Sequence, residues 1–248
     1  MIGRVEKYLL NKIDQNGAIH VTLLDPEKTS PEEAARTSEE AEKSGTSAIM
    51  VGGSTITSTS QLETTVKAIK KAVKIPVVLF PNNITGICGY ADAIWFMSLL
   101  NSSDPYYIFG AHILGAPLVR KLKLEPIPLG YVIIGEGGAA GVMGRAFPIP
   151  FDKPELAAAH ALAAEYLGMH FVYLEGGSGV KKTVPLEMIK MVRNSVNIPV
   201  IVGGGIRRGE QVEQIVKAGA NIVVTGNITE SGNAKGVLAE LVASARIK

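Results

Sequence analysis

The chain is almost without cysteine. Cys88 is the only one among its 248 residues. A single thiol excludes an intrachain disulfide and a metal site built from several cysteines, and it fits a reducing compartment. We therefore expect a cytoplasmic protein in which Cys88 is a small buried or loop residue.

Long apolar runs and blocks of like charge are also missing. No stretch approaches the roughly 18 apolar residues of a membrane span, and the charged beginning MIGRVEKYLLNKID lacks the apolar centre of a secretion signal. The formal charge is +2 and the Lys and Arg residues are interspersed, which argues against a clustered nucleic-acid-binding surface. The four histidines show no spacing typical of metal ligands. We expect no transmembrane segment and no nucleic-acid partner.

Apolar residues, by contrast, make up 46% of the chain, whereas charged residues make up 19%. Short runs rich in Val and Ile alternate with longer amphipathic segments, a pattern typical of β-α units around a parallel sheet. A complete eightfold barrel has about 250 residues. The sequence therefore predicts one α/β domain, residues 1–248, with the (β/α)8 TIM-barrel fold.

Eight strands and most of the helices between them can be placed. The expected strands are 18–24, 47–51, 77–80, 93–98, 129–134, 171–174, 200–202 and 222–225. The expected helices are 31–43, 60–73, 154–167, 185–194, 208–218 and 234–246, with Pro31, Pro154 and Pro185 in first-turn positions. Residues 2–13 predict a further helix that closes the bottom of the barrel. The segment 81–90 is too short and too rich in Gly and Asn for a full third helix, so that helix is irregular or missing.

Glycine-rich segments follow the last two predicted strands. VGGGIRRGEQ begins at the seventh strand and TGNITE at the eighth. Glycine lets backbone N–H groups approach an anion without interference from a Cβ atom, and active sites of such barrels lie at the carboxyl ends of the strands. Together the two loops predict a phosphate-binding site. The alternative is that these glycines only permit sharp turns.

The segment after the sixth strand, YLEGGSG at 173–179, adds a hydroxyl and a carboxylate beside the predicted phosphate site. A carboxylate repels phosphate, so Glu175 is better placed to accept hydrogen bonds from substrate hydroxyls and to act as a general base. The alternative is a residue at the barrel rim that pairs with a Lys or Arg.

Two oxygen-bearing side chains follow the first two strands. LLDPEK exposes Asp25 at a turn fixed by Pro26, and VGGS ends in Ser54. Mg²⁺ needs only one or two protein oxygens when diphosphate and water complete its octahedron, so this pair predicts a magnesium site. Taken alone, Asp25 is equally well explained as a helix cap. Lys28 is a further candidate contact for a diphosphate.

Two other segments have candidate roles. The loop GEGGAAGVMGR at 135–145 lacks the βαβ context of a dinucleotide fingerprint, and we interpret it as a mobile lid. The aromatic residues Trp95, Tyr106, Tyr107 and Phe109 are candidate walls for an apolar ligand. The alternative for these aromatics is ordinary packing.

The motifs HVTLLDPEK, VGGS, YLEGGSG, VGGGIR and TGN, in this order and over nearly the whole chain, resemble the geranylgeranylglyceryl phosphate synthase family. That family joins geranylgeranyl diphosphate to sn-glycerol 1-phosphate in archaeal lipid synthesis and forms dimers or higher assemblies. The resemblance implies that Mg²⁺ is held by Asp25 and Ser54 and that this chain is a homo-oligomer. It implies that glycerol phosphate is bound by Tyr173, Leu174, Glu175, Gly176, Gly177, Ser178 and Gly179, with its phosphate on Gly204, Gly205, Gly226 and Asn227.

The mechanism that the resemblance implies is displacement of diphosphate from C1 of the allylic substrate by the glycerol 3-hydroxyl, with Glu175 and Asp25 as catalytic residues. The chain departs from some relatives, which carry Lys where it has Leu23 and Tyr-Ser where it has Gly177 and Ser178. The alternatives from the residues alone are a sugar-phosphate isomerase or aldolase, and a non-catalytic barrel that binds a phosphorylated ligand.

Overall fold

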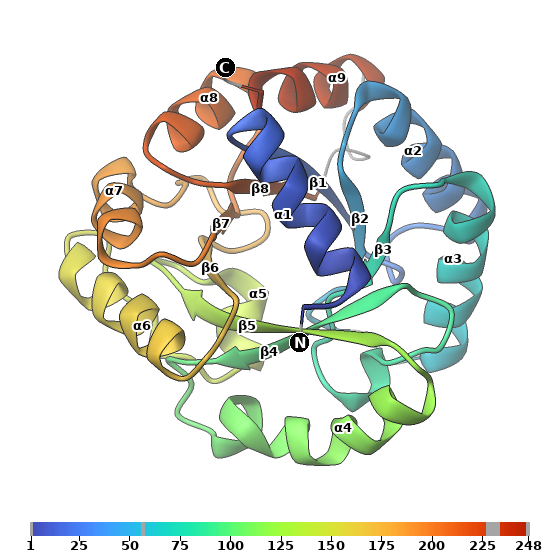
Figure 1. Ribbon diagram of the computed structural model, residues 1–248, viewed down its shortest axis with the longest axis horizontal. Coiled ribbons are helices and arrows are strands. Elements are labelled where there is room, and N and C mark those ends of the chain that lie inside the picture. The colour runs from blue at the N-terminus through green and yellow to red at the C-terminus, as the bar shows by residue number, and fades with distance from the viewer. Residues whose placement is uncertain (1, 56–57, 227–233, 247–248) are drawn as a thin grey trace.

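The strands form a closed barrel. In the computed structural model, which describes residues 2–55, 58–226 and 234–246, the sheet closes in the order β1 to β8, and every neighbouring pair is parallel. Helices surround it (Figure 1). The predicted TIM barrel is thus confirmed. The strands are β1 (Ile19–Leu24), β2 (Ala48–Val51), β3 (Val77–Leu79), β4 (Ala93–Leu99), β5 (Glu125–Ile133), β6 (Phe171–Glu175), β7 (Val200–Gly203) and β8 (Ile222–Thr225).

The strand β5 begins four residues before the predicted start at Leu129. Its first residues pair only with β4, because pairing with β6 begins at the Leu129–Phe171 register. A strand that lacks one neighbour tolerates proline, whose missing N–H then costs no ladder hydrogen bond. Pro126 and Pro128 therefore obscure a strand that the structure contains.

Most of the helices follow the predicted amphipathic segments, but the helices at 111–121 and 138–143 were not predicted. Ser30 caps the second helix by accepting a hydrogen bond from the Glu33 N–H at 3.2 Å, with Pro31 as the first helical residue. Pro185 was expected inside a first turn but is instead the extended residue before the helix. The helices are α1 (Arg4–Asn16), α2 (Pro31–Ser44), α3 (Thr59–Ala72), α4 (Ala111–Lys121), α5 (Gly138–Met143), α6 (Pro154–Tyr166), α7 (Leu186–Ser195), α8 (Gly209–Lys217) and α9 (Ala234–Ser244).

Alternation along the strands sorts the apolar residues into two layers. In β6, Tyr173 belongs to the layer inside the barrel, whereas Leu174 belongs to the layer between strands and helices. Both side chains are fully buried. Tyr173 therefore faces the interior of the barrel, whereas Leu174 does not.

The connection from β3 to β4 has no α-helix. A single 3₁₀ turn, η1 (Ile84–Gly86), stands where the barrel pattern would place one. Asn83 begins this turn, and its side chain accepts the Thr85 N–H at 2.7 Å. The predicted gap in the helical ring is confirmed, and α4 is the next full helix (Figure 1).

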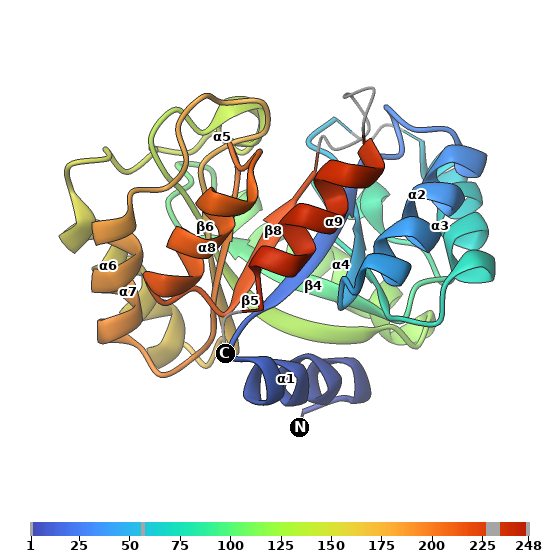
Figure 2. The ribbon, with the colours of Figure 1, turned by 90° about the horizontal axis from the view of Figure 1, so that it is seen from above.

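The helix α1 closes the amino-terminal end of the barrel (Figure 2). Its first residue is preceded by Gly3, which has no side chain to cap it, and the Glu125 carboxylate from β5 does so instead. Glu125 accepts the N–H groups of Val5 and Glu6, each at 2.8 Å. A Cβ atom on Gly3 would lie 2.2 Å from the Glu125 side chain, so a larger residue there would displace the capping carboxylate.

Within the residues that the structure describes, no helix combines the length and the apolar character needed to cross a membrane.

Candidate active site

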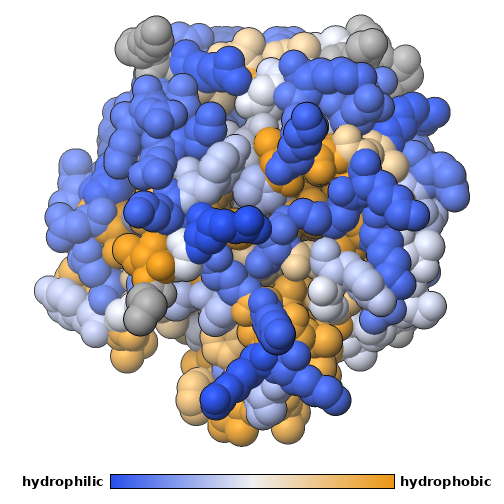
Figure 3. Space-filling view, turned by 45° about the vertical axis from the view of Figure 1, so that its right-hand side comes forward, coloured by the Kyte–Doolittle hydropathy of each residue, from blue (hydrophilic) through white to orange (hydrophobic). Residues whose placement is uncertain are grey.

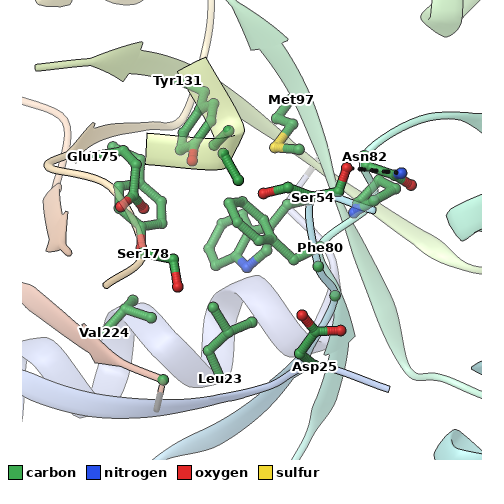
Figure 4. A pocket seen from close by; sticks show the side chains of 18 of the residues that line it. Leu23, Asp25, Ser54, Phe80, Asn82, Met97, Tyr131, Glu175, Ser178 and Val224 are labelled. Atoms are coloured by element: carbon green, nitrogen blue, oxygen red, sulfur yellow. Dashed lines mark hydrogen bonds between the residues drawn. The ribbon is translucent and has the colours of Figure 1, made fainter. Parts of the chain in front are cut away.

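A cavity of about 1010 Å³ opens at the carboxyl ends of the strands, opposite α1. The residues that follow β1, β2, β6, β7 and β8 line it, as do inner residues of α4 and α5. Figure 4 shows Glu175 and Ser178 on one side of this cavity and Asp25, Ser54 and Asn82 on the other. The loops that the sequence predicted to carry binding and catalytic residues therefore surround one cavity.

Glu175 is the last residue of β6 and is buried, with only 6% of its surface exposed. Its Oε1 accepts the Gly177 N–H at 2.7 Å, and the hydroxyls of Tyr131 and Tyr173 donate to the same carboxyl group. Burial raises the pKa of Glu175, and these hydrogen bonds oppose that rise. The carboxylate is thus held in place without a partner cation, unlike a rim residue in an ion pair.

Two glycines of β7 and its loop make room for this cluster. A Cβ on Gly203 would lie 2.1 Å from the Tyr173 hydroxyl, and a Cβ on Gly204 would lie 2.7 Å from Oε1 of Glu175. Gly204 and Gly205 also have φ angles of +90° and +72°, which favour glycine. The glycines therefore serve the turn and the site together.

The predicted phosphate-binding residues divide into two groups. Ser178, Gly179, Gly204, Gly205 and Gly226 line the cavity. Of the other predicted residues in 173–179, Tyr173 and Glu175 also line the cavity, whereas three do not: Leu174 faces the helices, Gly176 donates its N–H to Gly203, and Gly177 donates its N–H to Glu175. Asn227 lies outside the described residues.

Asp25 directly follows β1 and is half-buried. Its Oδ1 accepts the Glu27 N–H at 3.0 Å, so it forms a local turn, and Ser30 rather than Asp25 caps α2. Burial raises the pKa of Asp25, and Lys28 and the Glu27 N–H oppose the rise. A Cβ on Gly53 would lie 2.4 Å from Oδ1, so the glycine after β2 lets the carboxylate pack against that strand end.

Ser54 lines the same side of the cavity as Asp25 (Figure 4). Its carbonyl accepts the Asn82 side-chain N–H at 3.4 Å, which connects the β2 and β3 loops. Across the described ranges, no group of three or more His, Cys, Asp or Glu side chains gathers as a metal site would require. A cation here would therefore need oxygens from a ligand to complete its shell.

The cavity continues into an apolar arm beside the missing helix. The lining residues here include Ile84 and Ile87, in and just after η1, and Tyr107, Ala111 and Gly115, which precede and belong to α4. Tyr107 belongs to a π-helical turn, η2 (Tyr106–Gly110), which leads into α4. Gly115 lets α4 approach closely, because a Cβ there would lie 3.1 Å from Ile87. The gap in the helical ring thus becomes ligand space.

The four aromatic residues that were candidates for the cavity wall differ in position. Trp95 and Tyr107 line the cavity. Tyr106 does not line it, and Phe109 points outward with 64% of its surface exposed, so the prediction for these two is wrong. They face outward because η2 is helical, and successive residues of a helix cannot all face the same side.

The glycine-rich segment 135–145 contains the short helix α5, whose residues Ala139, Ala140 and Met143 cover part of the cavity. A Cβ on Gly138 would lie 3.2 Å from the Ser178 carbonyl, so this segment packs closely on the β6 loop. Its position over the cavity fits the predicted lid, and its motion remains a prediction.

The sequence prediction missed Tyr131 and Phe80. The rings of Phe80, Tyr131 and Tyr173 pack together with centroids 5.2 to 5.6 Å apart beneath Glu175. Alternation along β5 could have identified Tyr131, since Leu129, Tyr131 and Ile133 all face the interior.

Comparison with known proteins identifies close relatives. The chain is 52% identical over 247 residues to geranylgeranylglyceryl phosphate synthase of Thermofilum pendens, covering 99% of this chain and 96% of that protein. It is 51% identical over 230 residues to the enzyme of the same name from Pyrococcus abyssi, covering 93% and 91%.

Solved structures show similarity to the same enzyme. The crystal structure of (S)-3-O-geranylgeranylglyceryl phosphate synthase from Thermoplasma acidophilum in complex with its substrate sn-glycerol-1-phosphate superposes with a TM-score of 0.93 at 40% identity, covering 99% of both chains. Thiamine phosphate pyrophosphorylase from Pyrococcus furiosus shares only the fold, with a TM-score of 0.58 at 15% identity, covering 92% of this chain and 95% of that one. The PcrB family model matches residues 11–244. The chain therefore belongs to the PcrB family, in which it groups with the geranylgeranylglyceryl phosphate synthases.

Proposed function

We propose that this chain is a Mg²⁺-dependent prenyltransferase that joins the 3-hydroxyl of sn-glycerol 1-phosphate to geranylgeranyl diphosphate and releases diphosphate. The observation that carries the proposal is that one cavity connects a buried, hydrogen-bonded carboxylate to an apolar arm. A small hydroxylated phosphate and a long apolar chain can therefore lie in the same space.

The polar end suits glycerol phosphate. The backbone at Gly204, Gly205 and Gly226 faces the cavity, where N–H groups free of side chains can approach a phosphate. Glu175 stands close to Gly204 and can accept a hydrogen bond from a glycerol hydroxyl. The relative from Thermoplasma acidophilum, described as bound to sn-glycerol-1-phosphate, supports this substrate.

The pair formed by Asp25 and Ser54 fits a magnesium ion. A carboxylate and a hydroxyl are hard oxygen donors, and diphosphate oxygens with water can supply the other ligands. When bound, the metal would neutralise charge on the departing diphosphate. Lys28 lies at the same wall and can add a further positive charge.

The apolar arm suits the prenyl chain. Each buried CH₂ group contributes about 0.8 kcal/mol, so a long chain gains much of its affinity there. Tyr107 and Ile87 supply apolar surface along the arm. The names of the curated relatives support a geranylgeranyl chain.

In the proposed reaction, the bond between C1 and the diphosphate oxygen breaks while a bond from C1 to the glycerol 3-oxygen forms. The hydroxyl proton passes to Glu175, whose raised pKa makes it a better base for an alcohol. Tyr131 and Tyr173 hold the carboxylate in position by donating to it. The electron pair of the broken bond leaves with diphosphate.

The test is diphosphate release by the purified protein with geranylgeranyl diphosphate, sn-glycerol 1-phosphate and Mg²⁺. The 3-phosphate enantiomer and an EDTA control are run in parallel. We expect release that depends on both the enantiomer and the metal. No release with any prenyl length would contradict the proposal and leave a phosphate-binding barrel.

We also propose a cytoplasmic location and a homo-oligomeric state. Large apolar side chains exposed on several helices support self-association, among them Tyr166, Leu167 and Met191. Light scattering of the purified protein tests this, and a monomer at micromolar concentration would contradict it.

A further inference from the structure

The helix α4 has apolar side chains on both of its faces. Its inner face lines the cavity with Ala111, His112 and Gly115. Its outer side exposes Ile113 and Leu114 by 61% and 58%, and Phe109, just before it, by 64%. Figure 3 shows apolar side chains gathered at the lower edge of the molecule, where α4 lies, beside hydrophilic ones. Such a concentration on a protein surface usually marks a contact site.

The charges along the same segment have one sign. Residues 105–124 contain no Asp or Glu, whereas Arg120, Lys121 and Lys123 stand at the end of α4. All three are exposed. An exposed apolar helix face with cations and no acidic residues is the pattern of helices that lie in a membrane interface, where the cations attract anionic headgroups.

The outer face of α4 is also continuous with the ligand space behind it. Ile84 of η1 lines the cavity and is 39% exposed, and η1 contacts α4. The lining of the cavity therefore reaches the surface next to α4. A ligand that leaves along the arm would emerge next to this face.

We propose that the outer face of α4 docks on an anionic lipid surface, with Phe109, Ile113 and Leu114 in the apolar layer and Arg120, Lys121 and Lys123 at the headgroups. The choice of a lipid surface over another partner rests partly on the prenyl substrate proposed above. A prenyl diphosphate dissolved in that surface then enters the apolar arm without crossing water.

The experiment is co-sedimentation of the full chain with phosphatidylglycerol vesicles and with phosphatidylcholine vesicles. We expect binding to the anionic vesicles that weakens with salt, and little binding to the neutral ones. Ile113→Gln with Leu114→Gln should abolish binding. Arg120→Gln with Lys121→Gln should weaken it by about fivefold for each cation removed.

The matched control is Tyr166→Gln with Leu167→Gln, which removes similarly exposed apolar side chains from the end of α6. This control should bind vesicles as the parent does. Equal binding of the α4 variant and the control would overturn the proposal. The proposal would also be overturned if none of the proteins bound vesicles. If the α4 variant alone then showed a lower mass in light scattering, the outer face of α4 would be assigned to contact with a second copy of the chain.

Measurements of turnover test the lipid contact and the proposed function independently. With geranylgeranyl diphosphate in detergent micelles, the α4 variant should turn over as fast as the parent, and in anionic vesicles it should be slower. If no protein turns over substrate in micelles, the proposed function fails, while the sedimentation result still decides the lipid contact.

Discussion

The two ends of the cavity are built in different ways. The polar end consists of short loops that directly follow strands: glycines come from the loops after β2, β6, β7 and β8, and carboxylates or hydroxyls come from the ends of β1, β2 and β6. The apolar arm is formed by η1, β4 and α4, which all lie within residues 84–121, around a position where the barrel lacks a helix. The polar side chains of the site come from short motifs that directly follow strands. The space for a long ligand, by contrast, exists because the barrel lacks one helix.

The largest effect is expected at the polar end. Glu175→Gln should reduce turnover by about 10²- to 10⁴-fold, because the general base is lost. In the parent, kcat/KM should rise with pH through the raised pKa of Glu175 and level off above it, because only the ionised carboxylate accepts the proton. The variant should lack this acidic limb. Unchanged steady-state kinetics would make Glu175 a structural residue.

The second effect concerns the metal. Asp25→Asn should lower turnover by roughly 10²-fold or more, because the metal contributes several kcal/mol to charge stabilisation. Glycerol phosphate affinity, measured by calorimetry, should change little, since its site lies on the other side of the cavity (Figure 4). If both quantities fall equally, the metal assignment is wrong and the two ends are not independent.

The third change acts on the apolar arm alone. Ala111→Phe fills space on the inner face of α4, and displacing two CH₂ groups at about 0.8 kcal/mol each should raise KM for geranylgeranyl diphosphate by about tenfold. Ala116→Phe, on the exposed side of α4, is the matched control and should leave KM unchanged in detergent micelles. A change in glycerol phosphate affinity with Ala111→Phe would contradict the separation of the two ends.

The smallest effect should come from Tyr131→Phe. This change removes one hydroxyl that lowers the pKa of Glu175, so that pKa should rise further and the acidic limb of kcat/KM should move to higher pH. At a pH well above the limb, turnover should fall only a few-fold. A pH profile that coincides with the parent's would show that Tyr131 does not act through Glu175.

The contrast between the two ends also explains what the sequence could predict. The loops after β1, β2, β6, β7 and β8 were predicted because glycine and a polar side chain directly after an apolar run are local signals. The absent helix was expected for the same reason, since the segment 81–90 is too short to hold one.

The errors about which side chains line the cavity have one origin, namely orientation. Phe109 and Tyr106 were expected to line the cavity, but the π-helical turn η2 directs them elsewhere. Leu174 stands within a motif whose neighbours face the cavity, yet strand alternation turns it outward. Tyr131 was missed because nothing near it in sequence distinguishes it from a core residue. Its role depends on Glu175, 44 positions later in the chain, with which it shares the barrel interior.

The contact between Glu125 and the start of α1 has a consequence for the order of events during synthesis. The N–H groups of Val5 and Glu6 obtain their acceptor from a residue about 120 positions later. Until the ribosome has delivered β5, the thirteen-residue helix has no capping side chain at its start, and helices of this length are marginal on their own. The first segment made therefore obtains its capping side chain only after half the chain has emerged, when β1 to β4 have been made but β6 to β8 have not.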